Sequence, residues 1–245
     1  MNFNWVVIVP CFNAYLFCEK IIREIIPYVK HVIVVDDGST DGTSVVLQGL
    51  AQEYPSMHLI VFPHNRGKGF ALIESFKYAN ENLNFSGILT IDSDGQHSPK
   101  DIPHIIKEIE KGADMVIGTR QFFKMPFRSR IANTLILSFL RWFYKEAPYD
   151  TQSGFRAFTK ELSKKISEEV KGGRYETEFS CLLLALKEKN KIVPYDISTV
   201  YIENNKHSNF HILKDSFRIL KVLWQHVRKR SWCDRFSKSS FFRAE

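Results

Sequence analysis

The sequence alternates short apolar runs with segments of helical length, and this alternation constrains the fold more than any other feature. The apolar runs are rich in Val and Ile, as buried strands are, and they cover residues 5–10, 31–35, 59–62, 87–91 and 114–118. Segments of helical length lie between them, at 16–26, 41–54, 70–83 and 99–111. Strands that alternate with helices predict an α/β fold, with a mostly parallel sheet that is covered by helices on both faces.

Basic residues are concentrated at the end of the chain. The net charge is +7, and residues 206–245 hold ten Lys and Arg against three Asp and Glu, so the first 205 residues are balanced. We therefore expect a folded domain over 1–205 and a basic tail over 206–245. A neutral domain with a basic tail is typical of a protein that binds an anionic surface, either a membrane or a nucleic acid. A tail that is only solvated is the alternative.

Two segments bear on a membrane partner. In 210–230, apolar residues recur at three- and four-residue steps with basic residues on other faces, which predicts a helix that lies on a membrane surface. The alternative is a helix packed on the domain. The segment 131–144 is apolar nearly all round but too short to span a bilayer, and it predicts either a core helix or an interfacial one. No nucleic-acid-binding module is present, and we expect no nucleic-acid partner.

Other features limit the classes of protein further. There is no secretory signal and no run of about 18 apolar residues. The four cysteines form no CxxC pair, which argues against a zinc site or a disulfide framework and fits a reducing compartment. The absence of GxxxxGK[ST] excludes a P-loop NTPase, and the segment Cys11-Phe12-Asn13-Ala14 is not the Gly-rich loop that a nucleotidyltransferase needs.

Polar clusters suited to ligand binding follow the predicted strands. They are the pair Asp36-Asp37, the loop 65–69, the segment 92–97 and the pair Thr119-Arg120. In open parallel sheets, ligands bind outside the carboxyl ends of the strands. The sequence therefore predicts a ligand site at this edge of the sheet.

The strongest chemical signal is Asp92-Ser93-Asp94, after the fourth predicted strand. Two carboxylates at this spacing can approach one hard cation, and Mg²⁺ or Mn²⁺ takes few protein carboxylates together with substrate phosphates. Gln96 and His97 are each close enough in sequence to add a ligand atom. Asp, Ser and Gly also form ordinary solvated turns, but the position after an apolar strand favours a metal site.

Two other clusters suit a nucleotide. A carboxylate at Asp37 can accept hydrogen bonds from a base or a ribose, while Asp41 is expected to cap the following helix. The loop 65–69 places Arg66 and Lys68 among glycines before a helix, which suits the close approach of a phosphate. A glycine turn with solvated cations is the alternative for this loop.

Taken together, these motifs resemble those of family 2 glycosyltransferases, which have the GT-A fold. The resemblance covers about residues 4–205 and rests on the segments VIVPCFN at 7–13, VVDDGSTDGT at 34–43, NRGKG at 65–69 and DSDGQH at 92–97. The segment DTQSGFR at 150–156 is similar to the D-x-x-(S/C)-G-F-(R/K) segment of polyprenyl-phosphate (dolichyl-phosphate) mannosyl- and glucosyltransferases.

This resemblance implies roles for individual residues. The nucleoside pocket would be lined by Pro10, Phe12, Val35 and Asp37. The metal would be held by Asp92, Asp94 and Gln96. Further substrate-binding residues would be Lys68, Ser93, Arg130 and Asp150, and the catalytic residues would be Asp94, Arg120, Arg156 and Glu178. One departure is that Asn13 is followed by Ala14, where the family often has Asn-Glu, so a carboxylate contact to the nucleoside is missing.

The acceptor decides which residues the reaction needs. A departing nucleoside diphosphate builds negative charge that a metal and basic side chains neutralise, and the resemblance implies inversion at the sugar. A hydroxyl acceptor needs a general base, for which Glu176 and Glu178 are candidates; acidic residues in a first helical turn are also explained by the helix dipole. A phosphate acceptor is already ionised and needs cations instead, and Arg130 and Arg156 fit that need.

The prediction is a metal-dependent inverting hexosyltransferase. It would use a UDP- or GDP-linked sugar, a polyprenyl phosphate acceptor and Mg²⁺ or Mn²⁺, and it would attach peripherally to the cytoplasmic face of a membrane. One alternative is the same fold acting on a sugar hydroxyl in glycan or lipopolysaccharide assembly. A second is an inactive protein that binds nucleotide-sugars or a membrane partner.

Overall fold

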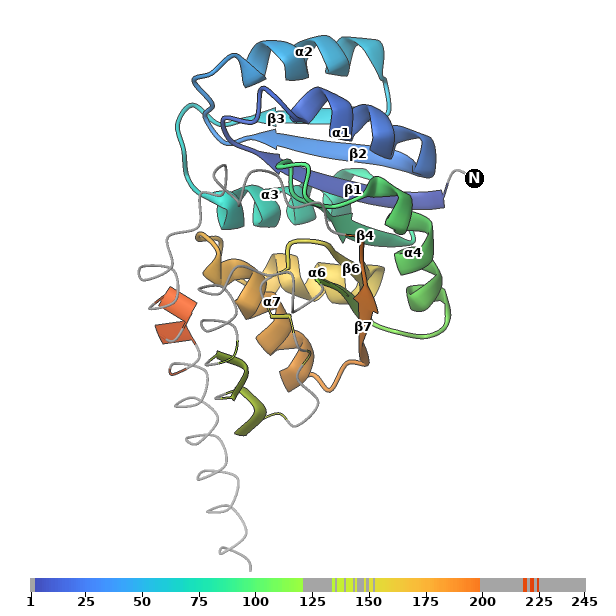
Figure 1. Cartoon of the computed structure of the whole chain (residues 1–245), viewed down its shortest axis with the longest axis vertical. Helices are drawn as coiled ribbons and strands as arrows, with labels where there is room; N and C mark the ends of the chain where they lie inside the picture. Colours follow the sequence, from blue (N-terminus) through green and yellow to red (C-terminus); the bar gives the residue numbers. More distant parts are fainter. Residues whose placement is uncertain are drawn as a thin grey trace, which may run out of the picture.

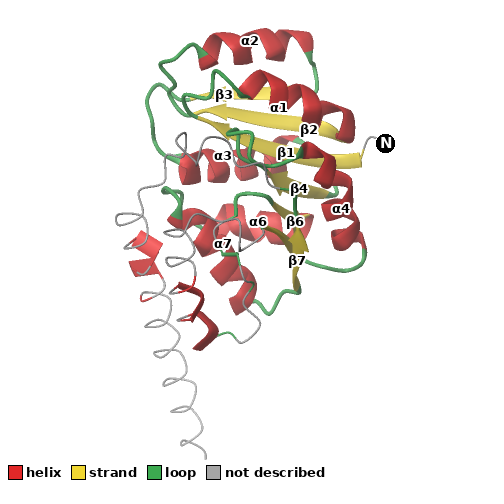
Figure 2. Ribbon diagram, in the orientation of Figure 1, coloured by secondary structure: helices red, strands yellow, loops and turns green. Residues whose placement is uncertain are grey.

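The structure is a computed structural model that describes residues 3–120, 134, 136–138, 140–142, 144, 148, 150–151, 153–198, 218–219, 221–222 and 224. In this part of the chain, a seven-stranded sheet has the strand order β3-β2-β1-β4-β6-β5-β7. Figures 1 and 2 show this sheet with helices packed against it.

The first half of the chain builds the elements that the alternation predicts. Its strands are β1 (Phe3–Cys11), β2 (Val29–Asp36), β3 (Met57–Val61), β4 (Gly87–Thr90) and β5 (Met115–Thr119). Its helices are α1 (Cys18–Ile25), α2 (Thr43–Glu53), α3 (Lys68–Asn82) and α4 (Ile102–Glu110), with short 3-10 helices η1 (Ile26–Tyr28) and η2 (Pro99–Asp101). Every predicted strand and helix in this half is confirmed.

The second half adds β6 (Arg156–Thr159), α6 (Lys160–Glu169), α7 (Glu176–Lys187) and β7 (Ile192–Asp196). β6 lies between β4 and β5 and runs antiparallel to both, whereas the other neighbouring strands are parallel. The mostly parallel sheet is therefore confirmed. The sequence does not predict β6, because its few residues follow a polar segment and are too short a run to show a pattern.

Alternate residues of each strand supply the two halves of the core. On one face, Val6 and Ile8 of β1 join a buried cluster with side chains of α3, α6 and α7. On the other face, Val7 and Val9 join a second buried cluster with side chains of α1, α2 and α4. This two-residue period is that of a strand buried on both faces, so the prediction of helices on both faces is confirmed.

The start of α2 differs from the prediction in detail. Gly42, at φ 93°, is the residue that precedes the helix, rather than Asp41. The Oδ1 atom of Asp41 nevertheless accepts hydrogen bonds from the backbone N–H of Thr43, at 3.1 Å, and from its hydroxyl, at 2.5 Å. Asp41 therefore satisfies the first turn of α2 from one position further back than predicted.

The two segments predicted to contact a membrane are described only in part. In 131–144, the side chains of Ile136, Leu137 and Leu140 belong to the buried core, whereas Trp142 is 83% exposed. In the tail, Ile219 is buried in the same core cluster and Trp224 is 58% exposed. Both segments therefore contact the domain. None of the helices in the described ranges has the length and apolar character that crossing a membrane requires.

Candidate active site

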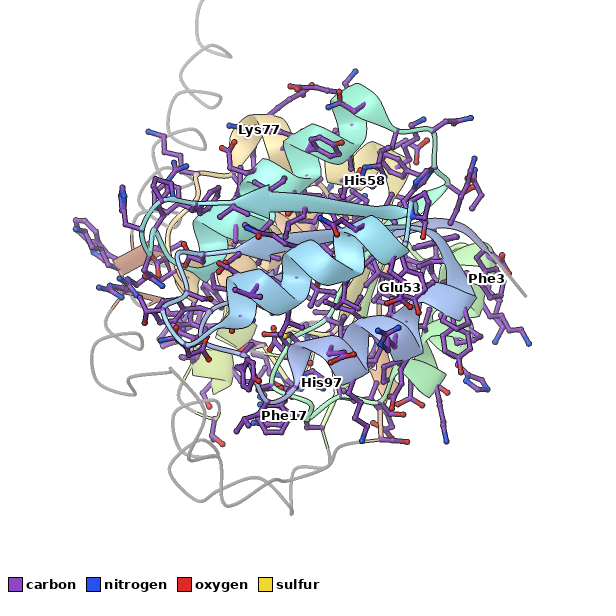
Figure 3. The ribbon with its side chains drawn as sticks, turned by 90° about the horizontal axis from the view of Figure 1, so that it is seen from above. Phe3, Phe17, Glu53, His58, Lys77 and His97 are labelled. Carbon is purple, nitrogen blue, oxygen red and sulfur yellow. The ribbon has the colours of Figure 1, made fainter. Side chains whose placement is uncertain are left out.

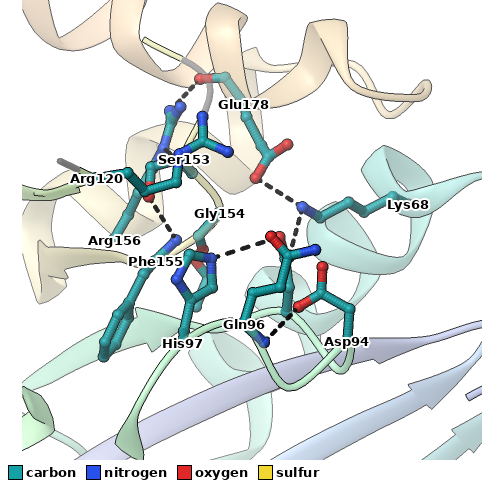
Figure 4. Close-up of polar contacts among 12 residues, drawn as sticks. Lys68, Asp94, Gln96, His97, Arg120, Ser153, Gly154, Phe155, Arg156 and Glu178 are labelled. Atoms are coloured by element: carbon teal, nitrogen blue, oxygen red, sulfur yellow. Dashed lines mark hydrogen bonds and ion pairs between the residues drawn. The ribbon is translucent and has the colours of Figure 1, made fainter. Parts of the chain in front are cut away.

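The predicted polar clusters, which follow β2, β3, β4 and β5, meet at one edge of the sheet. β6 and the first turn of α7 approach the same edge, because Arg156 and Glu178 contact one another there. Figure 3 shows His97 on the α1 side of the sheet and His58 on the α3 side. Figure 4 shows the polar side chains of the edge in close-up.

Asp37 organises the loop that the sequence assigns to phosphate. Its Oδ1 atom accepts a hydrogen bond from the backbone N–H of Arg66 at 2.7 Å, and its Oδ2 atom accepts one from Gly67 at 2.8 Å. Burial nevertheless raises the pKa of this carboxyl group. Both oxygens of Asp37 therefore fix the start of α3 next to the end of β2. A contact of Asp37 with the nucleoside stays a prediction.

The loop after β1 is tied to the loop after β2. Asn13, at φ 50°, donates its backbone N–H to the Ser39 hydroxyl at 2.9 Å and accepts one from the Thr40 N–H at 2.9 Å through its side chain. The residues predicted to line the nucleoside pocket lie beside these loops: Pro10 and Val35 are buried partners in the β1–β2 ladder, and Phe12 is half-buried. Asn13 thus joins the loop after β1 to the loop after β2 by hydrogen bonds.

The predicted metal ligands lie together in the loop after β4. Asp94 accepts a hydrogen bond from the backbone N–H of Gln96 at 3.0 Å through Oδ1, and Ser93 and Gln96 are buried. Burial and the adjacent charge of Asp92 raise the pKa of Asp94 to about 6. Two crowded carboxylates and an amide are hard oxygen donors, and a divalent cation would relieve the repulsion between them. This donor set therefore fits Mg²⁺ or Mn²⁺.

Lys68 stands between two carboxylates of this site. Its Nζ atom lies 2.5 Å from Oδ1 of Asp92 and 3.0 Å from Oε1 of Glu178 (Figure 4). Burial would lower the pKa of Lys68, but Asp92 and Glu178 outweigh it and the pKa is raised. Burial likewise acts to raise the pKa of Asp92, yet Lys68 and His97 lower it overall. Lys68 is therefore a charged partner inside the site.

His97 packs against the same carboxylate from the other side. Its Nε2 atom lies 3.9 Å from Oδ2 of Asp92, and its ring is tilted by 41° against the ring of Phe155, with 5.6 Å between centroids. The Nδ1 atom is buried and has no hydrogen-bond partner. Burial lowers the pKa of His97 to about 4, so the ring is neutral at physiological pH. Among the described residues, no three or more His, Cys, Asp or Glu side chains form a metal-binding group.

Arg120 forms a fork-like ion pair with Asp150. Its Nε atom lies 2.7 Å from Oδ2 of Asp150, and its Nη2 atom lies 3.0 Å from Oδ1. The charge of Arg120 acts to lower the pKa of Asp92, and it opposes part of the rise in the pKa of Asp94, so Arg120 lies near the predicted metal ligands. The resemblance implies that Asp150 binds substrate. In the structure, both of its carboxylate oxygens accept hydrogen bonds from Arg120 and hold that side chain in place.

Arg156 binds backbone carbonyl groups of two segments. The side chain is buried, and three of its nitrogens donate to backbone carbonyls: Nε to Ser153 at 2.7 Å, Nη2 to Thr151 at 2.8 Å, and Nη1 to Glu178. A guanidinium group bound in this way ties the segment before β6 to the first turn of α7. Arg156 therefore positions these segments, and its contact with an acceptor phosphate stays a prediction.

Glu178 and Glu176 differ in their surroundings. Glu178 is buried and paired with Lys68, and burial raises its pKa. Glu176 is half-buried, and its Oε2 atom has no hydrogen-bond partner. Both residues lie in the first turn of α7. Arg130, predicted to contact phosphate, lies outside the described residues.

Sequence reasoning misses two contributors to the site. A Cβ atom at Gly154 would collide with the carboxylate of Asp92, and the Gly154 carbonyl accepts a hydrogen bond from the Thr90 hydroxyl at 2.8 Å. The glycine of the SGF segment is the signal that marks this close approach. The ring of Tyr175 lies 5.6 Å from Nζ of Lys68, and no sequence pattern indicates that contact.

The mostly parallel sheet with a polar edge is that of an α/β protein that binds a ligand at the carboxyl ends of its strands. Comparison with known proteins names the family. The model of glycosyl transferase family 2 matches residues 6–167. The chain therefore belongs to this family, and it is a glycosyltransferase with the GT-A fold.

Individual proteins with similar sequences or structures can also be named. An uncharacterised protein of Methanocaldococcus jannaschii is 35% identical over 239 residues, which cover 90% of this chain and 91% of that protein. UDP-N-acetylglucosamine–dolichyl-phosphate N-acetylglucosaminyltransferase of Methanococcus voltae is 34% identical over 221 residues, which cover 80% of this chain and 85% of that enzyme. Among solved structures, Mycobacterium tuberculosis glucosyl-3-phosphoglycerate synthase with Mn²⁺, UDP and its product has a TM-score of 0.68 at 18% identity, over 91% of this chain and 79% of that chain.

Proposed function

We propose that this glycosyltransferase moves a hexose from a UDP- or GDP-linked donor to a polyprenyl phosphate, with inversion at the sugar. A relative that is 34% identical bears the name of a dolichyl-phosphate N-acetylglucosaminyltransferase. In the DTQSGFR segment at 150–156, Asp150 pairs with Arg120, and Gly154 packs against Asp92. UDP-N-acetylglucosamine is therefore the first donor to test.

The observation that carries the choice of acceptor is the ion pair between Glu178 and Lys68. A hydroxyl acceptor needs a carboxylate that is ready to take its proton. Glu178 is only 5% exposed, and its Oε1 atom is held by the Lys68 ammonium at 3.0 Å. A phosphate acceptor carries its negative charge already and needs no such base. The geometry therefore favours a phosphate over a hydroxyl.

The donor would be held by the loops at the edge of the sheet. We assign Asp92, Asp94 and Gln96 to a Mg²⁺ or Mn²⁺ ion, which when bound supplies positive charge to the departing diphosphate. Arg120, fixed by Asp150, adds a second cation beside it. The nucleoside would lie against Pro10, Phe12 and Val35, next to Asp37, while Ser93 and Arg130 complete the substrate contacts.

We also propose that the enzyme attaches peripherally to the cytoplasmic face of a membrane. The tail over 206–245 carries a net charge of +7, and each basic residue near an anionic leaflet contributes about 1 kcal/mol. Trp142 and Trp224 are exposed on segments that contact the domain, and Trp is enriched where proteins meet the lipid interface. A surface of this kind would bring the site to a lipid-linked acceptor.

A transfer assay tests the proposed function. The full chain is mixed with vesicles that contain polyprenyl phosphate, a radiolabelled sugar nucleotide (UDP-N-acetylglucosamine, UDP-glucose or GDP-mannose) and Mn²⁺. We expect label in the lipid fraction with one donor, at least a 100-fold loss in Asp94→Asn as for other removed electrostatic groups, and a loss with EDTA. Lys77→Gln, an exposed change on α3, serves as the control. Failure of every donor to label lipid, with the chain folded, would contradict the proposal.

A further inference from the structure

Lys68 forms an ion pair with Asp92, a carboxylate that we expect to bind the metal. It is the first residue of α3, and its side chain is only 16% exposed. The Nζ atom lies 2.5 Å from Oδ1 of Asp92, closer than its 3.0 Å approach to Oε1 of Glu178. Lys68 is therefore an internal cation that already neutralises Asp92.

An ammonium and a divalent ion do not share one carboxylate oxygen at these distances. The second oxygen of Asp92 faces His97, and the carboxylate is packed against Gly154, so Asp92 has little room to turn away. Like charges a few ångströms apart in a partly buried site repel strongly. Entry of a metal at Asp92 must therefore displace Lys68.

Glu178 can hold the Lys68 ammonium group after it leaves Asp92. Its Oε1 atom already contacts Nζ, and its backbone is fixed because Arg156 donates to its carbonyl. α3 and α7 touch so closely at Gly69 and Thr177 that a Cβ on Gly69 would overlap the Thr177 hydroxyl. The backbones that carry Lys68 and Glu178 are thus held together, and a rotation of the lysine side chain is enough to leave Asp92.

We propose that Lys68 is a built-in counter-cation that exchanges with the divalent metal at Asp92, and that Glu178 is the positioning residue that receives it. This inference rests on the metal use in the proposed function. In the exchanged state, Lys68 stays beside Glu178 and next to the diphosphate of the donor. Metal and donor should then favour each other's binding, because the diphosphate supplies negative charge to the displaced lysine.

The test measures the affinity of the full chain for Mn²⁺ alone, without sugar nucleotide, by the loss of the free-Mn²⁺ electron paramagnetic resonance signal. Lys68→Gln removes the competitor, and we expect Mn²⁺ to bind roughly tenfold more tightly, as for a coupling of ordinary size between two sites. Glu178→Gln leaves Lys68 on Asp92 alone, and we expect Mn²⁺ to bind several-fold more weakly. In the double variant, the effect of Glu178→Gln should shrink, because it acts through Lys68.

Two controls separate this exchange from a general effect. Lys68→Arg keeps the charge and should keep the weak affinity of the unaltered chain. Lys77→Gln removes a charge from an exposed part of the same helix and should change nothing. Glu178→Gln is nearly isosteric, so it remains informative if Lys68→Gln does not fold.

The exchange is contradicted by several results. They are unchanged or weaker Mn²⁺ binding in Lys68→Gln, an unchanged affinity in Glu178→Gln, full additivity in the double variant, or no Mn²⁺ binding in any variant. Sugar transfer to lipid phosphate by the unaltered chain is measured separately. A chain that transfers sugar but shows equal Mn²⁺ affinities would therefore contradict the exchange alone.

Discussion

Single side chains at this site act mainly by holding one another in place. Asp37 binds two loop amides, Asp150 binds Arg120, and Arg156 binds three carbonyls. Each is a charged group that would be costly to bury without these partners. The residues that we propose to contact a ligand thus lie among charged residues that hold the loops and side chains of the site in place. Both kinds of residue stand in the same sequence motifs.

Replacing Arg156 tests this positioning role. Arg156→Gln leaves buried carbonyls without a donor, and each such group costs about 1–3 kcal/mol. We expect the free energy of unfolding in urea to fall by about 3 kcal/mol, with kcat reduced because α7 is no longer fixed. Lys164→Gln, which removes one exposed charge from α6, should be neutral. If Arg156→Gln instead raises only the KM for lipid phosphate and keeps full stability, direct acceptor binding is correct.

At the scale of elements, a polar contact joins β2, β3 and α3. On the α3 side, the half-buried residues His31 of β2, His58 of β3 and Tyr78 of α3 form a chain of hydrogen bonds, 3.3 Å and 3.2 Å long. Burial lowers the pKa of both histidines, and for His31 the charge of His58 adds to the effect. Adjacent elements are thus joined by groups that are neutral in the folded state.

The hydrogen bonds among His31, His58 and Tyr78 predict how the stability of the protein depends on pH. Because the folded pKa values of His31 and His58 lie below 6.5, the unfolded chain binds more protons near that pH, and stability falls as the pH drops through it. Asp94, whose folded pKa is raised to about 6, acts in the opposite direction in this range. The histidine contribution is therefore measured as a difference: between pH 7.5 and 5.5, we expect the melting temperature of His58→Phe to fall less, or rise more, than that of the unaltered chain. His104→Phe, at an exposed histidine of α4, is the control. An equal pH dependence in His58→Phe and the unaltered chain would contradict this account.

The sequence predicts the elements of the first half well because each strand is a short apolar run and each helix is a longer segment between two such runs. Local patterns also place Asp92, Asp94 and Asp37 at strand ends. Contacts between distant residues escape this reasoning: Lys68 and Glu178 are 110 positions apart, and nothing local specifies their pairing. The same holds for Arg156, whose motif suggests a phosphate ligand although its partners are carbonyls that only the folded chain brings together.

At the scale of the whole molecule, the charge distribution and the site both favour the proposed lipid phosphate acceptor. The domain is electrically balanced, while the tail carries the excess positive charge. The edge of the sheet holds the cations and carboxylates suited to a sugar diphosphate. A lipid phosphate fits both features, because its chain belongs in the membrane and its head group needs no general base.

The most direct test compares polyprenyl phosphate with the matching polyprenol as acceptors. The two lipids have the same chain and differ only in whether a phosphate or a hydroxyl attacks the sugar. We predict transfer of label to polyprenyl phosphate alone, because the Lys68 ammonium holds Glu178, the buried candidate base, and a phosphate acceptor needs no base. Transfer to polyprenol at an equal rate, abolished in Glu178→Gln, would contradict the account and identify Glu178 as a general base.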